Sequence, residues 1–144
     1  MTEIQALLLI KSILESADIH GIENILAEDC EYMSTGRGII GRNRNESIEF
    51  LSSMTESIKA DNVPVTCKVM HITDVYEEDA LFHEGRHGLT VSYESGDNYV
   101  YMIFVDINDE GLVDRIVSSQ ENYSIEFDDL RFGDDESEYS FTTP

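Results

Sequence analysis

The sequence predicts a single α+β domain in which helices pack on one face of a curled antiparallel sheet. Its first 60 residues carry apolar side chains at helical spacing in three segments. After Asp61 the spacing changes to the alternation typical of β-strands, which continues to about residue 123. The chain has 144 residues, 41% of them apolar, which is enough for one core and leaves little room for a second domain.

Three amphipathic segments predict N-terminal helices at residues 3–17, 22–29 and 46–60. Thr2 and Asn45 are the expected N-caps of the first and third helices. A short strand at 30–33 follows the second helix. The glycine-rich segment 34–41 predicts a loop or hairpin, and it is no phosphate loop because no Gly-Lys-Ser/Thr follows it.

Alternating apolar residues then predict four antiparallel strands at 63–75, 81–93, 99–107 and 112–123. Turn residues separate them at 77–79, 95–98 and 108–111. The third of these strands is nearly all apolar, so we expect it to be covered on both faces.

The chain is strongly acidic, with nine Lys and Arg against 30 Asp and Glu, a net charge of −21. Such a surface repels phosphate backbones and anionic lipid heads, which argues against binding of nucleic acid or membranes.

Cys30 and Cys67 lie in no metal-binding pattern, so we expect buried, reduced thiols, no metal site and no cofactor, with one disulfide as the alternative. Lys11 and Glu15 interrupt the first apolar run, which argues against a signal peptide or membrane span and for a cytoplasmic protein.

The C-terminal residues differ in composition from the rest. From Glu121 onward there are eight acids and only Arg131, which leaves −7 on the last 24 residues and −14 on the first 120. We therefore predict a domain at 1–123 and an acidic C-terminal extension at 124–144. The extension is either a solvated tail or a segment that docks through its aromatic residues, on this domain or on a partner.

Three stretches, in this order and spacing, resemble the nuclear transport factor 2-like superfamily, which has a cone-shaped, cystatin-like α+β fold. They are the glycine link and acidic helix end within residues 18–32, the glycine and Ile-x-x-Phe/Leu pattern within 41–51, and the Asp-Gly turn within 108–116. The resemblance implies helices packed on the concave face of the sheet, with a pocket between them. The superfamily includes ketosteroid isomerases, polyketide-cyclase-like enzymes and dehydratases, and also non-catalytic binding and transport domains.

The isomerase pattern is not expected to be functional in this chain. When the two are aligned on Gly21 and on Ala27–Asp29, the isomerases' general-base Asp falls at Ser34 and their oxyanion-hole Tyr at Ile10. Serine takes no carbon-bound proton without a partner base, and isoleucine donates no hydrogen bond.

Histidines are the first candidates for pocket chemistry. Alternation places the odd-numbered residues of the two middle strands on the concave face, among them His71, His83 and His87. A hairpin centred on Glu77 would set His71 opposite His83, about 5 Å away. Such a pair could bind a metal or move a proton. The alternative is that they are hydrogen-bonded wall residues or lie exposed at the strand edge, because two imidazoles without a carboxylate make a poor metal site.

Hydroxyl groups are the second candidates. An inward Tyr101 hydroxyl could orient a ligand, and Tyr32 and Ser34 at the end of the first strand are further pocket candidates. The alternative for Tyr101 is packing with its aromatic neighbours.

Charged residues outside the pocket give two further expectations. Arg37, Arg42 and Arg44 lie within eight residues and are candidates for binding an anion, or the acidic extension, outside the core. The alternative is a solvated loop with weak ion pairs. Glu84 and Arg86 alternate away from the pocket, so we expect an exterior ion pair.

Three functions remain open on this sequence. The first is a domain that binds a small hydrophobic or polar molecule between the helices and the concave sheet. The second is a lyase, cyclase or isomerase that uses pocket His or Tyr side chains. The third is a protein-interaction module, of the inhibitor or immunity type, that binds a basic partner. We also expect a homodimer through the open sheet face.

Overall fold

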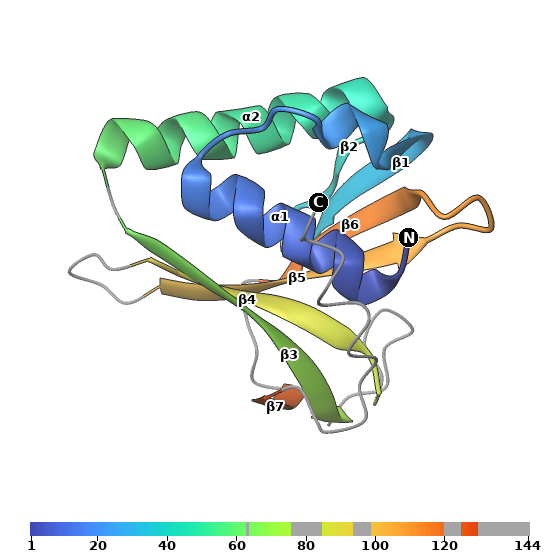
Figure 1. Ribbon diagram of the computed structural model, residues 1–144, viewed down its shortest axis with the longest axis vertical. Coiled ribbons are helices and arrows are strands. Elements are labelled where there is room, and N and C mark those ends of the chain that lie inside the picture. The colour runs from blue at the N-terminus through green and yellow to red at the C-terminus, as the bar shows by residue number, and fades with distance from the viewer. Residues whose placement is uncertain (63, 76–84, 94–98, 120–124, 130–144) are drawn as a thin grey trace.

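The computed structural model describes residues 1–62, 64–75, 85–93, 99–119 and 125–129. Figure 1 shows two helices on one face of a curved sheet, so the protein is α+β as predicted. In chain order the elements are α1 (Glu3–Ser16), the short 3-10 turn η1 (Ile22–Asn24), β1 (Leu26–Ser34), β2 (Gly38–Gly41), α2 (Arg44–Asp61), β3 (Val65–Val75), β4 (His87–Tyr93), β5 (Tyr99–Ile107), β6 (Val113–Ser119) and β7 (Ile125–Asp129).

The sheet has seven strands in the order β2-β1-β6-β5-β4-β3-β7. All neighbours are antiparallel except β1 and β6, which run parallel, so the prediction of a wholly antiparallel sheet is wrong at this pair. The cause is topological. β2 pairs with one edge of β1, and β6 pairs with the other edge after β5 has set its direction.

Both long helices begin at side-chain caps. The Thr2 hydroxyl accepts the Gln5 amide N–H at 3.2 Å, and the Gln5 side chain accepts the Thr2 N–H at 2.9 Å, which confirms the first N-cap. The cap of α2 is Asn43 rather than Asn45, since the Asn43 side chain accepts the Glu46 N–H at 2.9 Å. Among the described residues, no helix is both long and apolar enough to cross a membrane.

The prediction of a third N-terminal helix at 22–29 is wrong. Gly21 takes a left-handed conformation with φ 88°, one 3-10 turn follows, and the chain enters β1 at Leu26. The apolar spacing in this stretch is compatible with a helix, but β6 offers the backbone partners of a strand. The Val113 N–H donates to the Ile25 carbonyl at 2.8 Å.

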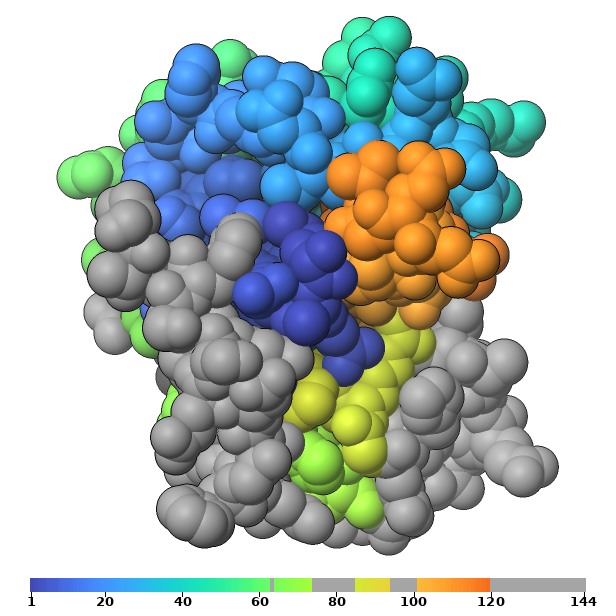
Figure 2. All heavy atoms as spheres, turned by 45° about the vertical axis from the view of Figure 1, so that its right-hand side comes forward, coloured from blue at the N-terminus to red at the C-terminus, as the bar shows by residue number. Residues whose placement is uncertain are grey.

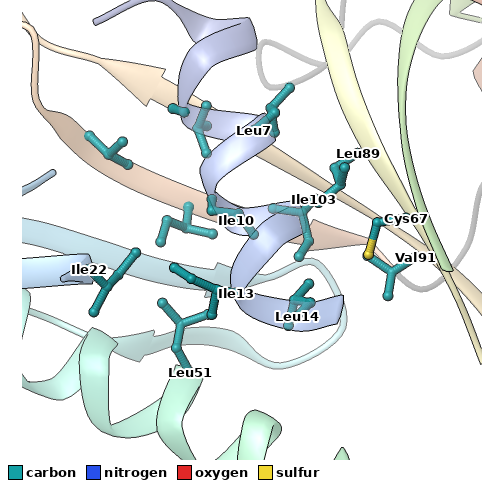
Figure 3. Close-up of a cluster of buried hydrophobic side chains, with 14 of the residues drawn as sticks. Leu7, Ile10, Ile13, Leu14, Ile22, Leu51, Cys67, Leu89, Val91 and Ile103 are labelled. Carbon is teal, nitrogen blue, oxygen red and sulfur yellow. The ribbon is translucent and has the colours of Figure 1, made fainter. Parts of the chain in front are cut away.

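The main core lies between the helices and the concave, helix-covered face of the sheet (Figure 3). It confirms that the odd-numbered residues of the middle strands point inward: Cys67, Val69, Leu89, Val91, Tyr101, Ile103 and Val105. A second buried cluster, to which Ile72, Met102, Phe104 and Val117 belong, lies on the opposite face. As predicted, β5 is therefore covered on both faces between Tyr101 and Val105.

Two sequence expectations concern the cysteines and the C-terminal extension. Cys30 and Cys67 are free and buried, and burial raises the pKa of each thiol to about 12, so both are unreactive thiols near neutral pH. Within the predicted extension, residues 125–129 form β7, which pairs with β3. The interpretation as a solvated tail is therefore wrong for these five residues. Residues 130–144 lie outside the described part, and the domain boundary stays a prediction.

Gly41 lets the start of α2 approach β1. A Cβ atom at Gly41 would lie 2.9 Å from both the backbone nitrogen and the hydroxyl of Ser47, whose hydroxyl donates to the Cys30 carbonyl at 2.9 Å. We expect Gly41→Ala to lower the free energy of unfolding by about 2 kcal/mol through overpacking. Urea denaturation measures it, with Gly36→Ala as control because nothing lies within 4 Å of that Cβ. Equal stability of the two variants would contradict the close approach.

Candidate functional site

Three tyrosines on the concave face bring hydroxyl groups into the apolar core. We call Tyr32 of β1, Tyr93 of β4 and Tyr101 of β5 the tyrosine cluster. The Tyr93 and Tyr101 hydroxyl oxygens lie 3.0 Å apart, and the Tyr32 hydroxyl donates to the Met54 sulfur at 3.6 Å. The Tyr32 ring also lies 4.6 Å from the Phe50 ring. The β4–β5 pair therefore brings the Tyr93 and Tyr101 hydroxyls together, while α2 packs against Tyr32 on the same concave face.

Burial keeps these phenols neutral. It raises the pKa of Tyr32 to about 12, although the Ser118 hydroxyl partly offsets the effect. Burial also raises the pKa values of the Tyr93 and Tyr101 hydroxyl groups. At physiological pH all three side chains can donate a hydrogen bond, and none can serve as a phenolate base.

Half-buried apolar side chains border the tyrosine cluster. Phe50 and Met54 of α2 contact Tyr32, and Val65 of β3 lies opposite Tyr93. All three pack against the main core while keeping part of their surface accessible. Ser34 is buried and lies in register with Ser118 on the parallel strand β6. Alternation from Tyr32 directs Ser34 to the concave face. The Tyr32, Ser34 and Tyr101 candidates thus all lie on the concave face, and their joining in one ligand site stays a prediction.

The histidine candidates lie elsewhere and pair differently from the prediction. His71 is opposite His87, not His83, with ring centroids 5.4 Å apart and nearly perpendicular planes. The prediction is wrong because it assumed a hairpin centred on Glu77, whereas the observed register centres it two residues later. His83 itself lies outside the described residues. Within the described ranges, no three His, Cys, Asp or Glu side chains gather closely enough to hold a metal ion.

The histidine pair and the tyrosine cluster do not share a site. Tyr101 is opposite Val91 in the β4–β5 register, and His87 lies four residues from Val91 along β4. Four strand residues span about 13 Å. A small ligand at the Tyr101 hydroxyl therefore does not reach both imidazoles.

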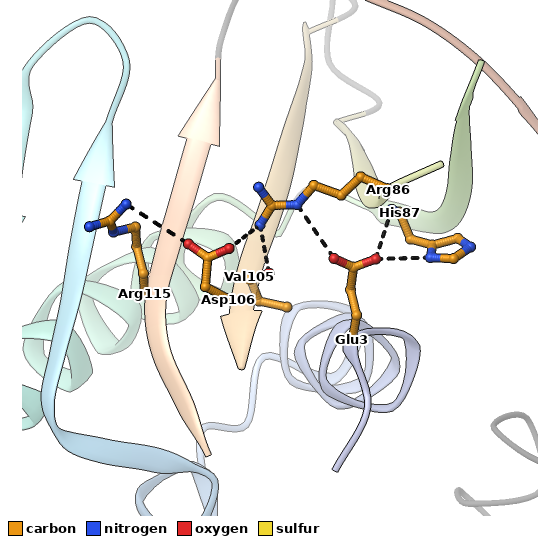
Figure 4. A network of polar contacts seen from close by, with 6 residues as sticks. All are labelled: Glu3, Arg86, His87, Val105, Asp106 and Arg115. Atoms are coloured by element: carbon orange, nitrogen blue, oxygen red, sulfur yellow. Dashed lines mark hydrogen bonds and ion pairs between the residues drawn. The ribbon is translucent and has the colours of Figure 1, made fainter. Parts of the chain in front are cut away.

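A buried arginine occupies the histidine end of the sheet, where the sequence predicted an exterior ion pair (Figure 4). Arg86 is only 6% exposed, and its guanidinium lies 2.6 Å from Asp106 and 3.4 Å from Glu3. Glu3 also accepts the His87 N–H at 2.8 Å and lies 2.9 Å from its Nδ1. The prediction fails because the outer face carries the second buried cluster, where the guanidinium lies 5.6 Å from the Phe104 ring centroid. Glu84 lies outside the described residues.

This network fastens the beginning of α1 to the sheet. Figure 2 shows the dark-blue start of the chain seated against the yellow β4 and the orange residues of β5 and β6. The Met1 amino group also donates to the Gly111 carbonyl at 3.0 Å. Both arginines of the network, Arg86 and Arg115, have an anionic partner here, so its geometry favours a structural role. Sequence reasoning missed it because Glu3, Arg86 and Asp106 are far apart in the chain.

The three clustered arginines stay outside the core, as predicted. Arg37 and Arg42 are exposed and Arg44 is half-buried. The backbone N–H of Arg42 donates to Glu46 at 3.2 Å, beside the Asn43 cap. Within the described part of the chain their guanidinium groups have no ion pair, and an anion-binding role stays a prediction.

Solved structures match this chain over most of its length, whereas no protein-family model and no curated protein matches it. SalBIII, an epoxide hydrolase/cyclase-like enzyme in pyran ring formation of the polyether salinomycin, is 13% identical over 83% of this chain and 91% of that one, with a TM-score of 0.55. A cystatin-like-fold protein from Silicibacter pomeroyi is 16% identical over 82% and 74%, with a TM-score of 0.57. A nuclear transport factor 2-like protein of unknown function from Cytophaga hutchinsonii is 12% identical over 82% and 98%, with a TM-score of 0.52.

These matches confirm the fold that the sequence motifs predicted. The chain has the nuclear transport factor 2-like, cystatin-like fold. Its structural neighbours include cyclase-like enzymes and proteins of unknown function, so the fold is compatible with either ligand binding or catalysis.

Proposed function

We propose that this protein binds a largely apolar small molecule, with a hydrogen-bond acceptor such as a carbonyl oxygen, beside the tyrosine cluster. The observation that carries the proposal is the set of three neutral phenols on the concave face, bordered by half-buried apolar side chains. Apolar walls with a few convergent polar groups are typical of small-molecule sites. The hydroxyls would orient the ligand, and Phe50, Met54 and Val65 would contact its apolar part.

Binding accounts for this region better than acid–base catalysis does. Neutral phenols could polarise an epoxide or carbonyl oxygen, and one structural neighbour is an epoxide hydrolase/cyclase-like enzyme. A reaction would also need a group that accepts a proton. In the sequence alignment on Gly21 and Ala27–Asp29, Ser34 and Ile10 fall where the isomerases carry their base and donor, and both residues are buried. The pair of histidines formed by His71 and His87 lies at the other end of the sheet, away from the tyrosine cluster.

The naphthalene ketone Prodan tests the proposal, because it is neutral, apolar and carries one carbonyl acceptor. We expect it to bind with a rise in fluorescence. The double variant Tyr93→Phe/Tyr101→Phe should weaken binding about fivefold, since a lost hydrogen bond is worth about 1 kcal/mol. Its bound emission should also shift to the blue, because the carbonyl loses its donors. A fluorescence titration measures both effects.

Two variants complete the design. Val65→Trp places a bulky side chain at the apolar border and should prevent binding. Thr90→Val changes β4, the strand of Tyr93, on its other face, where the Thr90 hydroxyl donates to the Lys68 carbonyl at 3.1 Å, and it should leave the titration unchanged. If all variants bind Prodan like the unmodified protein, the ligand site is not at the tyrosine cluster.

A further inference from the structure

We propose that a groove on the outer side of α1 binds a basic segment of a partner protein through one aliphatic side chain. The groove lies between the second half of α1 and the segment that returns alongside it to η1 (Figure 1). It is separate from the tyrosine cluster, so this inference is independent of the proposed function.

The floor of the groove is apolar. Ile13 and Ile22 are buried beneath it, while Leu9 and Ile25 are half-buried at its sides. Its volume is about 280 Å³. Because pockets for drug-sized ligands typically measure about 300–1,000 Å³, this one suits one or two side chains better than a cofactor.

The rim of the groove is acidic. Between Ser12 and Asp29 the chain carries five carboxylates and no Lys or Arg, and all five carboxylate residues are exposed. Glu15 is paired with Lys11 at 2.7 Å. Asp18 lines the groove, and Glu23 lies in the adjoining turn; neither has an ion pair with a described residue. Both carboxylates are therefore available to attract a cation beside the apolar floor.

The negative charge around the groove also favours one kind of binding partner over another. A second copy of this chain carries −21 as well, so it would bring like charge to an acidic rim. A segment with one Leu-type side chain flanked by Lys or Arg matches both the floor and the rim. Such a segment would bury its aliphatic group on Ile13 and Ile22 and place its cations near Asp18 and Glu23.

The peptide Arg-Lys-Leu-Lys-Arg, capped at both ends, is the probe, and amide chemical shifts of the full chain are the readout. We expect shifts confined to residues around 9–25. Raising the NaCl concentration from about 20 to about 200 mM should weaken peptide binding by a factor of about five or more. The same peptide with Ala for Leu should bind at least about fivefold more weakly, because it loses the apolar contact. Shifts scattered over the whole acidic surface, or equal binding of the Ala peptide, would overturn the proposal.

Matched variants locate the site. Ser12→Tyr fills the groove from an exposed position of α1 and should abolish the shifts, whereas Ser53→Tyr, at an exposed position of α2, should preserve them. Asp18→Asn keeps an acceptor for the His20 N–H at 3.0 Å but loses the charge, and should weaken binding more than Asp61→Asn does. If Gly-Gly-Leu-Gly-Gly binds as well as the basic peptide, the groove takes neutral ligands and the basic partner is ruled out.

Discussion

Replacing Arg86 with methionine should lower the free energy of unfolding by about 3–5 kcal/mol, the cost of breaking a buried ion pair by removing one partner. The guanidinium is almost fully enclosed and lies 2.7 Å from the Val105 carbonyl, in addition to its contacts with Glu3 and Asp106. Methionine keeps most of the aliphatic volume but leaves two carboxylates near each other without their shared cation. Urea denaturation followed by far-UV circular dichroism measures the change.

Arg115→Met is the matched control, since Arg115 is partly exposed and lies 3.9 Å from the same Asp106. We expect a loss below about 1 kcal/mol, as is usual for an exposed pair. The triple variant Glu3→Gln/Arg86→Met/Asp106→Asn should recover part of the stability, because no uncompensated charge remains. Equal stability of the Arg86→Met and Arg115→Met variants would show that Arg86 is not an enclosed, paired cation.

The spacing of apolar residues within one segment was enough to predict those elements that do not depend on a distant strand. The capped α1 and the doubly covered β5 follow from spacing within one segment, and the structure confirms both. The stretch after Gly21 could not be decided in this way. Its spacing fits a short helix, and only the backbone of β6, almost 90 residues later, makes it a strand.

Non-local register explains the wrong site predictions. Alternation correctly placed His71 and His87 on the inner face, but it does not give the length of the connection between two strands, which decides the opposite residue. Arg86 was assigned to solvent because it alternates outward. That assumption fails where the outer face has its own apolar cluster, and no single strand reveals such a cluster.

The tyrosine cluster was predictable in part. Alternation directs Tyr101 inward, and the family resemblance places Tyr32 and Ser34 near the pocket. The hydrogen bond between Tyr93 and Tyr101 was not predictable, because it joins diagonal neighbours whose register depends on the connection between β4 and β5. The groove beside α1 was missed for a similar reason. The apolar residues of its two walls have ordinary helical spacing in the sequence, and the groove exists only because the folded chain holds the two walls apart.

Leu14→Ala should lower the free energy of unfolding by about 3 kcal/mol, through lost apolar contact and the cavity it leaves. Leu14 is fully buried and points from α1 into the main core (Figure 3). Leu9, on the outer side of the same helix, is half-buried, so Leu9→Ala should cost about 1 kcal/mol or less. Thermal and urea denaturation measure the stability of the two variants. Because both carry a Leu→Ala change, the difference between them reports the burial of the two faces of α1.

This comparison also bears on the ligand site. If α1 fills its part of the concave face, space for a ligand remains only on the α2 side, beside Tyr32 and Phe50. A cavity at Leu14 should then leave Prodan affinity within about twofold while stability falls, because the apolar border of α2 is unchanged. Small and equal losses for Leu14→Ala and Leu9→Ala would instead mean that α1 packs loosely on the sheet, and the ligand would have a second place to bind beneath it.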